Sequence, residues 1–264
     1  MKTITFDDFY TLVSESHPEL LCDTPYQLGS TDNTLYFLTG GCVVYWLAST
    51  TQNGKRSITC DIHELVPDAD LPAVCHIFYD KIKAESPDSY YIFLYHKGPL
   101  TEELNRFFGW RVFARSPSPA GADPRVVDLT HDDADEIARL CDRTAYSDYP
   151  DLGGFEFEAD SFAQWDFDFA EEYSIKLLGL RIDGTLAGVA AYSEQQPGNL
   201  GFFRELYVAP PFRRHGIGKA LVETAISRLP DRTWVYQAAR DNATSIALAK
   251  SAGFTFYGAT LILE

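Results

Sequence analysis

The sequence has no long hydrophobic run. Its most apolar stretch, residues 42–48, is far shorter than the ~20 residues that a membrane-spanning helix needs. The first residues, MKTITFDDFYTLV, contain no apolar segment after the lysine of the kind that secretory signals have. We therefore expect a soluble cytoplasmic protein without a membrane partner.

Cysteines are few, and their number is odd. The five cysteines form no C-x-x-C pair, which is typical of a reduced intracellular protein and not of a disulfide framework. Cys60, His63, Cys75 and His76 would be the alternative, a zinc site, but their spacing fits no compact zinc template well. Because free cysteine is commonly a small buried apolar residue, we expect no metal.

Basic residues are scarce relative to acidic ones. The chain has 22 Lys and Arg residues against 38 Asp and Glu residues, which gives a formal net charge of −16. A field of this sign repels phosphate backbones and accommodates a cationic substrate more easily, so we expect no nucleic-acid partner. The 45% hydrophobic and 14% aromatic residues suffice for a globular core. At ~150 residues per domain, the 264 residues correspond to about two domains.

Residues 116–124 (SPSPAGADP) read as a linker, because Pro, Gly and Ser cluster there without a periodic apolar pattern. The predicted domains are therefore 1–115 and 125–264. In the second domain, Asp183-Gly184 predicts a tight hairpin turn and Gly253 a helix end. The hydrophobic pattern there predicts strands at 125–129, 175–182, 186–192, 202–208, 233–238 and 255–262, and helices at 132–141, 218–229 and 243–252.

The first half ends with the same order of elements. We predict strands at 56–65, 90–95 and 110–113 and helices at 73–84 and 101–108. The segments FFGWRVF and SAGFTFY both place an aromatic residue after a glycine and then begin a strand. This similarity indicates an internal duplication. The alternative is convergence on a helix–glycine–strand connection that many αβ proteins share.

The most informative motif is R-x-x-G-x-G, formed by Arg213, Gly216 and Gly218. It follows a predicted strand and opens a predicted helix, where backbone N–H groups and the helix dipole favour an anion. Arg214 and Lys219 add positive charge in a chain that is otherwise acidic. The spacing fits neither a P-loop nor a dinucleotide-binding fingerprint. The alternative is that the glycines serve packing only.

With its flanks, this motif resembles the GNAT superfamily of N-acetyltransferases. The resemblance rests on ELYVAPPFRRHGIGKALVETAI, followed by a strand and then DNATSIALAKSAGFTFYG. It covers roughly residues 125–264 and implies an α/β (α+β) fold, a mixed central sheet with flanking helices. The first half would be a second, degenerate GNAT-like copy in tandem, without the coenzyme loop. Asp68 and Asp70 lie where its cradle would be, and they would repel a pyrophosphate.

The resemblance also implies an acyl-CoA cosubstrate, most simply acetyl-CoA. Two neighbouring parallel strands, 202–208 and 233–238, would separate to admit the pantetheine arm. Backbone groups of Leu206, Tyr207 and Val208 would pair with its amides. Asn242 would contact the arm, or would be a plain helix N-cap. The pyrophosphate cradle would consist of Arg213, Arg214, His215, Gly216, Ile217, Gly218 and Lys219.

Catalysis in this family is direct attack of an amine on the thioester, which needs a general base. Glu205 is the candidate base, and the alternative is a salt bridge to Arg204 or Arg240. The oxyanion donor would be a backbone N–H near Val208.

The general acid is where the chain departs from the family. The position that often holds a tyrosine is Ala249, four residues before Gly253. Tyr257 is the candidate replacement, with Tyr236, Tyr207 and water as further alternatives.

Residues 142–172 are rich in acidic and aromatic side chains and would form the acceptor wall. They could hold an amine by charge pairing and cation–π contacts, or could form a helix with a solvated acidic face. We therefore expect an N-acyltransferase that acts on the primary amine of a small molecule, a cationic one included, or of a peptide. The alternative is a catalytically weak or inactive acyl-CoA-binding or interaction module.

Overall fold

The computed structural model describes residues 1–16, 18–20, 34–50, 54–67, 69–140, 167–172, 174–195 and 199–263. The chain forms two compact units. The first unit contains Met1–Val112 and Phe256–Glu264, and the second unit contains Phe113–Thr255. The predicted linker thus falls inside the second unit, and most of the last strand falls inside the first. That the units descend from a duplicated domain stays a prediction.

The first unit is built on a mixed sheet whose strands follow the order β1, β2, β3, β4, β5, β12, β6. Strands β4 and β5 pair in parallel, whereas β1 with β2, β2 with β3, β3 with β4 and β5 with β12 pair antiparallel. Helix α1 packs over β2 and β3, and helix α2 packs over β4. The bounds are β1 Lys2–Ile4, α1 Phe6–Ser16, β2 Thr34–Thr39, β3 Cys42–Thr50, β4 Arg56–Glu64, α2 Leu71–Glu85, β5 Ser89–Lys97, β6 Gly109–Arg115 and β12 Thr255–Leu263, with 3-10 turns η1 Pro18–Leu20 and η3 Leu104–Arg106.

The predicted elements of the first half are present with one exception. The segment 101–108, predicted as a helix, contains only the single turn η3. Phe107 is already extended (φ −72°, ψ 142°), and Gly109 begins β6. Leu104 and Phe107 pack against the core, whereas Glu102, Glu103 and Arg106 are exposed. The turn and the extended residue after it thus place these two partly buried apolar side chains against the core.

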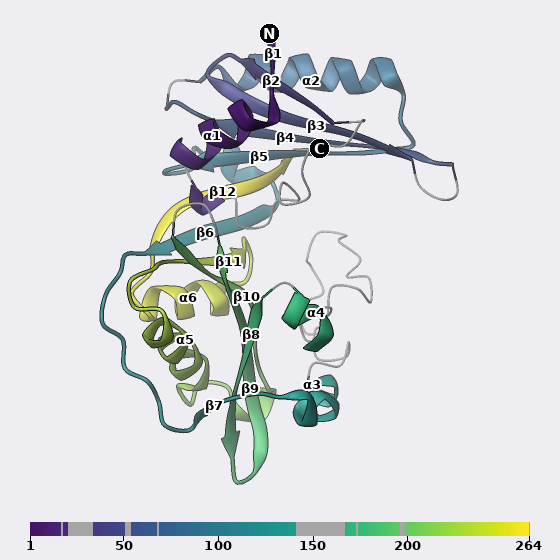
Figure 1. Ribbon diagram of the computed structural model, residues 1–264. Coiled ribbons are helices and arrows are strands. Elements are labelled where there is room, and N and C mark those ends of the chain that lie inside the picture. Colours follow the sequence, from purple (N-terminus) through teal and green to yellow (C-terminus); the bar gives the residue numbers. More distant parts are fainter. Residues whose placement is uncertain are drawn as a thin grey trace. The chain divides into compact units, whose positions relative to one another are not determined.

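The second unit has a sheet with the order β11, β10, β9, β8, β7, in which only β10 and β11 are parallel. Helices α5 and α6 lie on one face of this sheet, and α3 and α4 lie on the other (Figure 1). The bounds are β7 Val126–Asp128, η4 His131–Asp133, α3 Ala134–Leu140, α4 Phe167–Glu172, β8 Ile175–Ile182, β9 Thr185–Gln195, β10 Leu200–Val208, η7 Pro210–Phe212, α5 Ile217–Arg228, β11 Thr233–Ala239 and α6 Ala243–Ser251.

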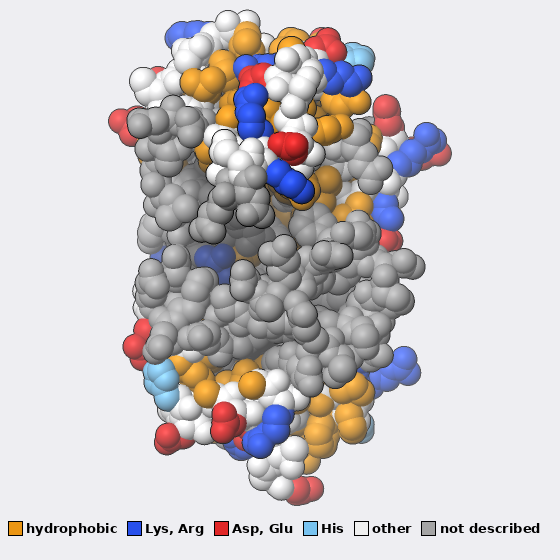
Figure 2. Space-filling model, turned by 90° about the vertical axis from the view of Figure 1, so that its right-hand side faces the viewer, with side chains coloured by type: hydrophobic (Ala, Val, Ile, Leu, Met, Phe, Trp, Pro, Cys, Tyr) orange, Lys and Arg blue, Asp and Glu red, His pale blue; other side chains and the backbone are white. Residues whose placement is uncertain are grey.

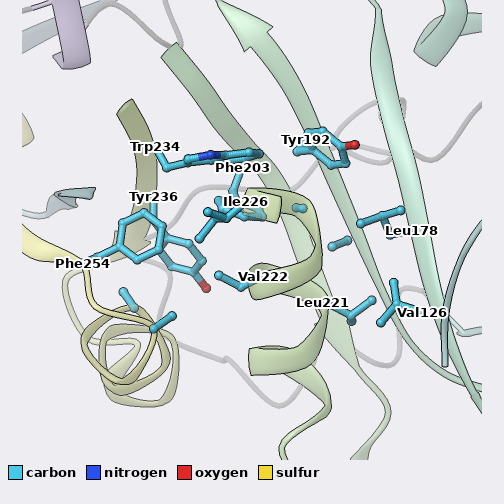
Figure 3. Packing of buried hydrophobic residues seen from close by; sticks show 14 of the residues in the cluster. Val126, Leu178, Tyr192, Phe203, Leu221, Val222, Ile226, Trp234, Tyr236 and Phe254 are labelled. Atoms are coloured by element: carbon cyan, nitrogen blue, oxygen red, sulfur yellow. The ribbon is translucent and has the colours of Figure 1, made fainter. Parts of the chain in front are cut away.

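Each face of the second sheet has its own hydrophobic core. Toward α5 and α6, the aromatic rings of Phe203, Trp234, Tyr236 and Phe254 pack together beside α5 (Figure 3). Toward α3 and α4, a second cluster contains Val189, Ala191 and Tyr207 together with Ile137 and Leu177. Alternation of side chains along each strand separates the two cores.

The predicted turns of the second unit are confirmed. Asp183 (φ 49°) and Gly184 (φ 80°) join β8 to β9, and both have the positive φ that a two-residue hairpin needs. Gly253 (φ 81°) follows the end of α6, and the N–H of Phe254 donates to the carbonyl of Ala249. Positive φ favours glycine here because it has no Cβ.

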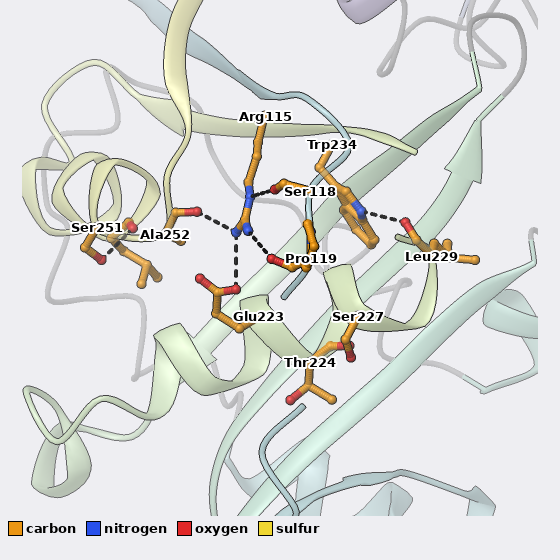
Figure 4. A network of polar contacts seen from close by, with 11 residues as sticks. Arg115, Ser118, Pro119, Glu223, Thr224, Ser227, Leu229, Trp234, Ser251 and Ala252 are labelled. Atoms are coloured by element: carbon orange, nitrogen blue, oxygen red, sulfur yellow. Dashed lines mark hydrogen bonds and ion pairs between the residues drawn. The ribbon is translucent and has the colours of Figure 1, made fainter. Parts of the chain in front are cut away.

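The predicted linker is held against α5. The Arg115 guanidinium donates to the carbonyl of Ala252 (2.7 Å), to Glu223 of α5 (3.2 Å) and to Ser118 (3.1 Å) (Figure 4). Near the other end, the N–H of Asp123 donates to the hydroxyl of Thr224 (3.0 Å). One arginine thus joins β6, the linker, α5 and the end of α6.

One face of the molecule carries side chains of both charges despite the net excess of acid. On the described part of the face seen in Figure 2, Lys and Arg side chains are interspersed with Asp and Glu. Among the described residues, no helix is both long enough and apolar enough to cross a membrane.

Candidate functional site

Strands β10 and β11 separate along their length. They pair in parallel from Leu200↔Thr233 to Phe202↔Val235, and there the pairing ends. Both strands continue beyond this point, β10 to Val208 and β11 to Ala239. The backbone of β10 remains paired on its other side with β9 as far as Val208↔Gly188. The separation expected of strands 202–208 and 233–238 is therefore present.

An irregularity in β10 turns Glu205 toward the face of α3 and α4. Phe203 lies opposite Tyr192, but Glu205 lies opposite Ala191, so that Arg204 is the extra residue of a β-bulge. Tyr192 belongs to the core beneath α5, whereas Ala191 belongs to the core beneath α3 and α4. Without the bulge, Glu205 would share the face of Phe203, because side chains alternate.

The loop after β10 leads to a helix N-terminus that has no side-chain cap. Gly216 is the N-cap of α5 with φ 80° and ψ 0°, and no side chain among the described residues caps this end. The first intrahelical bond runs from the N–H of Ala220 to the carbonyl of Gly216. The N–H groups of Ile217, Gly218 and Lys219 therefore have no acceptor within the helix, and they combine with the positive end of its dipole.

The two glycines of the motif serve different purposes. A Cβ on Gly216 would have no atom within 4 Å, so this residue is needed for its backbone conformation and leaves open space at the helix end. A Cβ on Gly218 would lie 3.1 Å from Leu248 Cδ2 of α6 and 3.6 Å from Leu206 Cδ2 of β10. Gly218 therefore allows α5 to pack closely on its neighbours, which agrees in part with the packing alternative.

The positive residues of the motif divide into two groups. Arg213 folds back on β10, where its Nε donates to the carbonyl of Val208 (3.0 Å) and its guanidinium carbon lies 5.8 Å from the centre of the Tyr207 ring. Arg214, His215 and Lys219 are exposed around the N-terminus of α5. Arg213 thus fixes the loop to the strand, and the other three supply charge to the open end of the helix.

Asn242 is the N-cap of α6. Its side-chain oxygen accepts from the N–H of Ser245 (2.9 Å), so the N-cap alternative is observed. The hydroxyl groups of Ser245 and Tyr236 share a hydrogen bond of 2.9 Å. Tyr236 is the first residue of β11 beyond the last pair with β10. The start of α6 is therefore tied to β11 where the two strands separate.

Glu205 is half-buried on β10. Of the arginines considered as its partners, Arg204 donates from Nε to the hydroxyl of Ser193 (3.1 Å), and Arg240 contacts Asp241 (2.9 Å). Sequence reasoning did not identify Arg204 and Ser193 as residues of this face. The placement of Arg204 follows from the bulge, which has no signal in the sequence pattern.

Tyr257 belongs to the first unit. Burial and a hydrogen bond to Glu19 raise the pKa of its phenol, which therefore keeps its proton at neutral pH. The Lys97 ammonium lies 5.2 Å from the centre of the same ring. Ala249 is fully buried in the core beneath α5 and α6. A role of Tyr257 as general acid stays a prediction.

The corresponding part of the first unit has a different geometry. Its parallel strands β4 and β5 stay paired from Ser57↔Ser89 to His63↔Tyr95. The following helix α2 begins at the N-cap Asp70, whose carboxylate accepts from the N–H of Ala73 (3.2 Å), and it has a proline in its first turn. Of the two predicted acids, Asp68 lies outside the described residues.

The described residues form no cluster of three or more His, Cys, Asp or Glu side chains that could hold a metal ion. Cys42, Cys60 and Cys75 are free thiols, and burial raises the pKa of Cys42 to about 12 and that of Cys75 to about 11. Cys22 and Cys141 lie outside the described residues. So does most of the predicted acceptor wall, of which only α4 is described.

Comparisons with known proteins agree with this geometry. Residues 135–254 match the acetyltransferase (GNAT) family. None of the curated proteins matches the sequence. Among solved structures, a GCN5-related N-acetyltransferase from Sphaerobacter thermophilus is 12% identical, with a TM-score of 0.54 over 99% of this chain and 93% of that one. An acetyltransferase of the GNAT family from Colwellia psychrerythraea is 12% identical, with a TM-score of 0.54 over 100% and 99%.

A tandem GNAT protein from the clavulanic acid biosynthesis pathway is 13% identical, with a TM-score of 0.53 over 98% of this chain and 96% of that one. Since these likenesses cover nearly the whole chain, they show that both units have the fold of these proteins. The predicted fold class, a mixed sheet with flanking helices in a tandem GNAT arrangement, is confirmed.

Proposed function

We propose that this chain is an acyl-CoA-dependent N-acyltransferase, because residues 135–254 match the acetyltransferase (GNAT) family. The donor is most simply acetyl-CoA. The acceptor is the primary amine of a small molecule, a cationic one included, or of a peptide.

One observation carries the proposal: an uncapped helix N-terminus lies beside two strands that separate. The N–H groups at the start of α5 need an anion, and the exposed Arg214, His215 and Lys219 favour one with several negative charges. A pyrophosphate meets both requirements. The gap beyond Phe202↔Val235 leaves a strand edge on β10 with which an amide-bearing arm can pair. These residues fit a coenzyme A thioester.

In this proposal Glu205 removes a proton from the acceptor ammonium, directly or through a water molecule. The amine nitrogen then attacks the thioester carbon, so that a C–N bond forms and the C–S bond breaks. The thiolate takes the second amine proton, and the first remains on Glu205 until it passes to solvent. A backbone N–H near Val208 would stabilise the oxyanion. The predicted proton donor to sulfur is Tyr257. Tyr236, Tyr207 or a water molecule are the alternatives.

For the first unit we propose a degenerate copy that does not bind the coenzyme. Two features support this: the pairing of β4 with β5 persists where β10 and β11 separate, and the carboxylate of Asp70 occupies the start of α2. A helix end that already holds a carboxylate repels a second anion.

A non-catalytic acyl-CoA-binding module is the second candidate. Ala249 favours it, because a buried methyl group stands where the family often has a proton donor. Such a module would bind acetyl-CoA but would transfer the acetyl group to no member of a broad amine panel.

The test is calorimetric titration of the protein with acetyl-CoA, in parallel with Gly216→Glu. Gly184→Glu is a matched control, because Gly184 also has φ 80° and no atom within 4 Å of its Cβ position. Both variants add the same charge and the same backbone strain. We expect Gly216→Glu to abolish binding and Gly184→Glu to retain it. Wild-type protein that is folded but does not bind would refute the coenzyme site.

A further inference from the structure

The side chain of Arg213 holds the last peptide group of β10, where the strand borders the gap. From this contact we propose that Arg213 is a positioning residue of the transfer reaction, which keeps the N–H of Val208 directed at the thioester oxygen. In this role Arg213 touches neither the coenzyme nor the acceptor. The role rests on the proposed acyltransferase function, and it differs from the pyrophosphate contact that the family resemblance implies.

The pairing of β10 with β9 determines which backbone groups face the gap. Hydrogen-bonded and non-hydrogen-bonded pairs alternate along an antiparallel ladder. The N–H of Ala209 donates to the carbonyl of Ala187 (3.0 Å), and these two residues flank the pair Val208↔Gly188. Val208↔Gly188 is therefore a non-hydrogen-bonded pair, so the N–H and the carbonyl of Val208 point away from β9. The same holds for Leu206, two residues earlier, and both residues thus face the side from which β11 has separated.

Arg213 binds one of these outward-facing groups. Its Nε donates to the carbonyl of Val208 (3.0 Å), and its guanidinium carbon lies 5.8 Å from the centre of the Tyr207 ring. This carbonyl and the N–H of Ala209 belong to one peptide group, which Arg213 and Ala187 therefore hold from opposite ends. Because a peptide group is planar, two such bonds fix its orientation. They also restrict rotation of the preceding peptide group, which carries the N–H of Val208.

The contact changes what the edge of β10 offers to a thioester. Leu206 presents an N–H and a carbonyl, which suit an amide of the pantetheine arm. At Val208 the carbonyl is bound to Arg213, so the edge ends in a donor. A thioester oxygen accepts hydrogen bonds and becomes negatively charged when the amine attacks the adjacent carbon. An open carbonyl at Val208 would repel this charge, whereas the guanidinium withdraws that acceptor and brings a positive charge beside it.

The next residue, Arg214, provides a direct contrast. Arg213 is half-buried against β10, whereas Arg214 is exposed at the start of α5 and has a φ of 66°. The two arginines carry the same charge and are consecutive, but they lie against different groups. Loss of the Arg213 side chain should therefore alter the reacting carbonyl, and loss of the Arg214 side chain should alter the affinity for the coenzyme.

The experiment separates binding of acetyl-CoA from polarisation of its carbonyl. Calorimetry gives the dissociation constant. Infrared difference spectroscopy with acetyl-CoA isotopically labelled at the acetyl carbonyl gives the stretching frequency, which an N–H donor lowers. Arg213→Met should bind acetyl-CoA about as tightly as wild-type protein but should lose part of the lowering of this frequency. Its kcat, measured with the amine that wild-type protein acetylates fastest in a panel of polyamines, amino acids and short peptides, should fall by roughly tenfold to a hundredfold, because a misplacement of about 1 Å at the reacting atoms costs up to this much.

Three further variants complete the comparison. Arg213→Lys keeps a charged donor without the planar guanidinium, so it should recover part of the frequency shift and of kcat. Arg214→Met should weaken acetyl-CoA binding. Arg228→Met is the control, because it removes an exposed arginine at the other end of α5 that pairs with Asp128, and it should leave affinity, frequency and kcat unchanged.

Two results would overturn the role of Arg213 while leaving the proposed function intact. One is a carbonyl frequency and a kcat in Arg213→Met that equal those of wild-type protein. The other is a loss of acetyl-CoA affinity as large as that of Arg214→Met with unchanged kcat at saturation, because Arg213 would then be a pyrophosphate contact. If Arg213→Met does not fold, the same comparisons with Arg213→Lys decide. Folded wild-type protein that does not bind acetyl-CoA would instead refute the coenzyme site and this role together.

Discussion

At Gly218, α5 lies close to its neighbours. Whether Gly218→Ala stabilises or destabilises the helix should therefore depend on Leu248. An alanine at position 218 would place its Cβ 3.1 Å from Leu248 Cδ2, inside the ~3.5–4.0 Å optimum for two carbon atoms. Forcing such a contact costs about 1–3 kcal/mol in a well-packed region. Replacing glycine by alanine within a helix contributes about 1 kcal/mol in the opposite direction. Gly218→Ala alone should therefore be neutral or destabilising by up to about 2 kcal/mol.

Shortening Leu248 to alanine removes the steric cost of the new Cβ at position 218. In a Leu248→Ala background, the atom that the new Cβ would meet first is absent, and only the gain in helix propensity remains. Gly218→Ala should then stabilise α5 by about 1 kcal/mol. The double-mutant cycle should give a favourable coupling of at least about 1 kcal/mol between the two positions. Leu248→Ala itself supplies the reference for the cavity that it creates.

Hydrogen exchange of the α5 amides is the suitable assay, because it reports the opening of this helix independently of the other unit. The same change in exchange free energy for Gly218→Ala in both backgrounds would refute the packing explanation. Glycine would then be required at this position for another reason, such as direct contact with a ligand.

Three further predictions concern catalysis, the linker and pH. Glu205→Gln should lower kcat by about 10²–10⁴-fold with unchanged acetyl-CoA affinity, since a general base contributes this much; steady-state kinetics and calorimetry measure the two effects. Arg115→Met should destabilise the second unit by about 2–3 kcal/mol in urea unfolding, because it removes part-buried hydrogen bonds to Glu223 and Ala252. Arg228→Met, which removes only the exposed ion pair with Asp128, should cost less than about 1 kcal/mol. The hydrogen bond between Glu64 and His96 (2.5 Å) raises the pKa of His96 above its usual value. The contribution of this pair to the free energy of unfolding is therefore complete below about pH 6.5 and is lost as the pH rises through the folded-state pKa of His96. The free energy of unfolding of the first unit, measured against pH, should show this decrease, and His96→Gln should make the pH dependence flatter.

Each of these has a contrary outcome. Unchanged turnover in Glu205→Gln would remove the residue from the mechanism. Equal stability of the Arg115→Met and Arg228→Met variants would mean that the contacts of Arg115 contribute no more than an exposed ion pair. A first unit whose stability is constant from pH 6 to pH 8 would show that the pair between His96 and Glu64 forms no favourable charged contact in solution.

Much of the second unit could be predicted, because its turns and helix ends are determined by residues close together in the sequence. Asp183-Gly184 and Gly253 adopt the positive φ that their sequence context favours, and Asn242 caps α6 through a hydrogen bond to a residue three positions away. Gly216 likewise adopts a conformation that few other residues tolerate. Short-range chemistry of this kind acts before tertiary packing and is visible in one sequence.

The remaining features depend on contacts between distant segments. The bulge at Arg204 reverses the face of Glu205, and a regular alternation would have assigned it to the side of Phe203. Arg115 holds a segment that reads as a flexible linker, because its partners Glu223 and Ala252 lie far along the chain. Tyr257 is paired with Glu19, near the opposite end of the sequence. No local pattern encodes these partners.

The central claim is that acetyl-CoA binds at the start of α5 and along the edge of β10. Hydrogen exchange of the full chain with and without saturating acetyl-CoA tests it most directly, because the backbone N–H groups themselves are proposed to contact the ligand. We predict that acetyl-CoA slows exchange at residues 217–219 and 206–208. We predict no slowing at the start of α2, where Asp70 already caps the helix. Protection confined to the first unit, or no protection in either unit at saturation, would contradict the account.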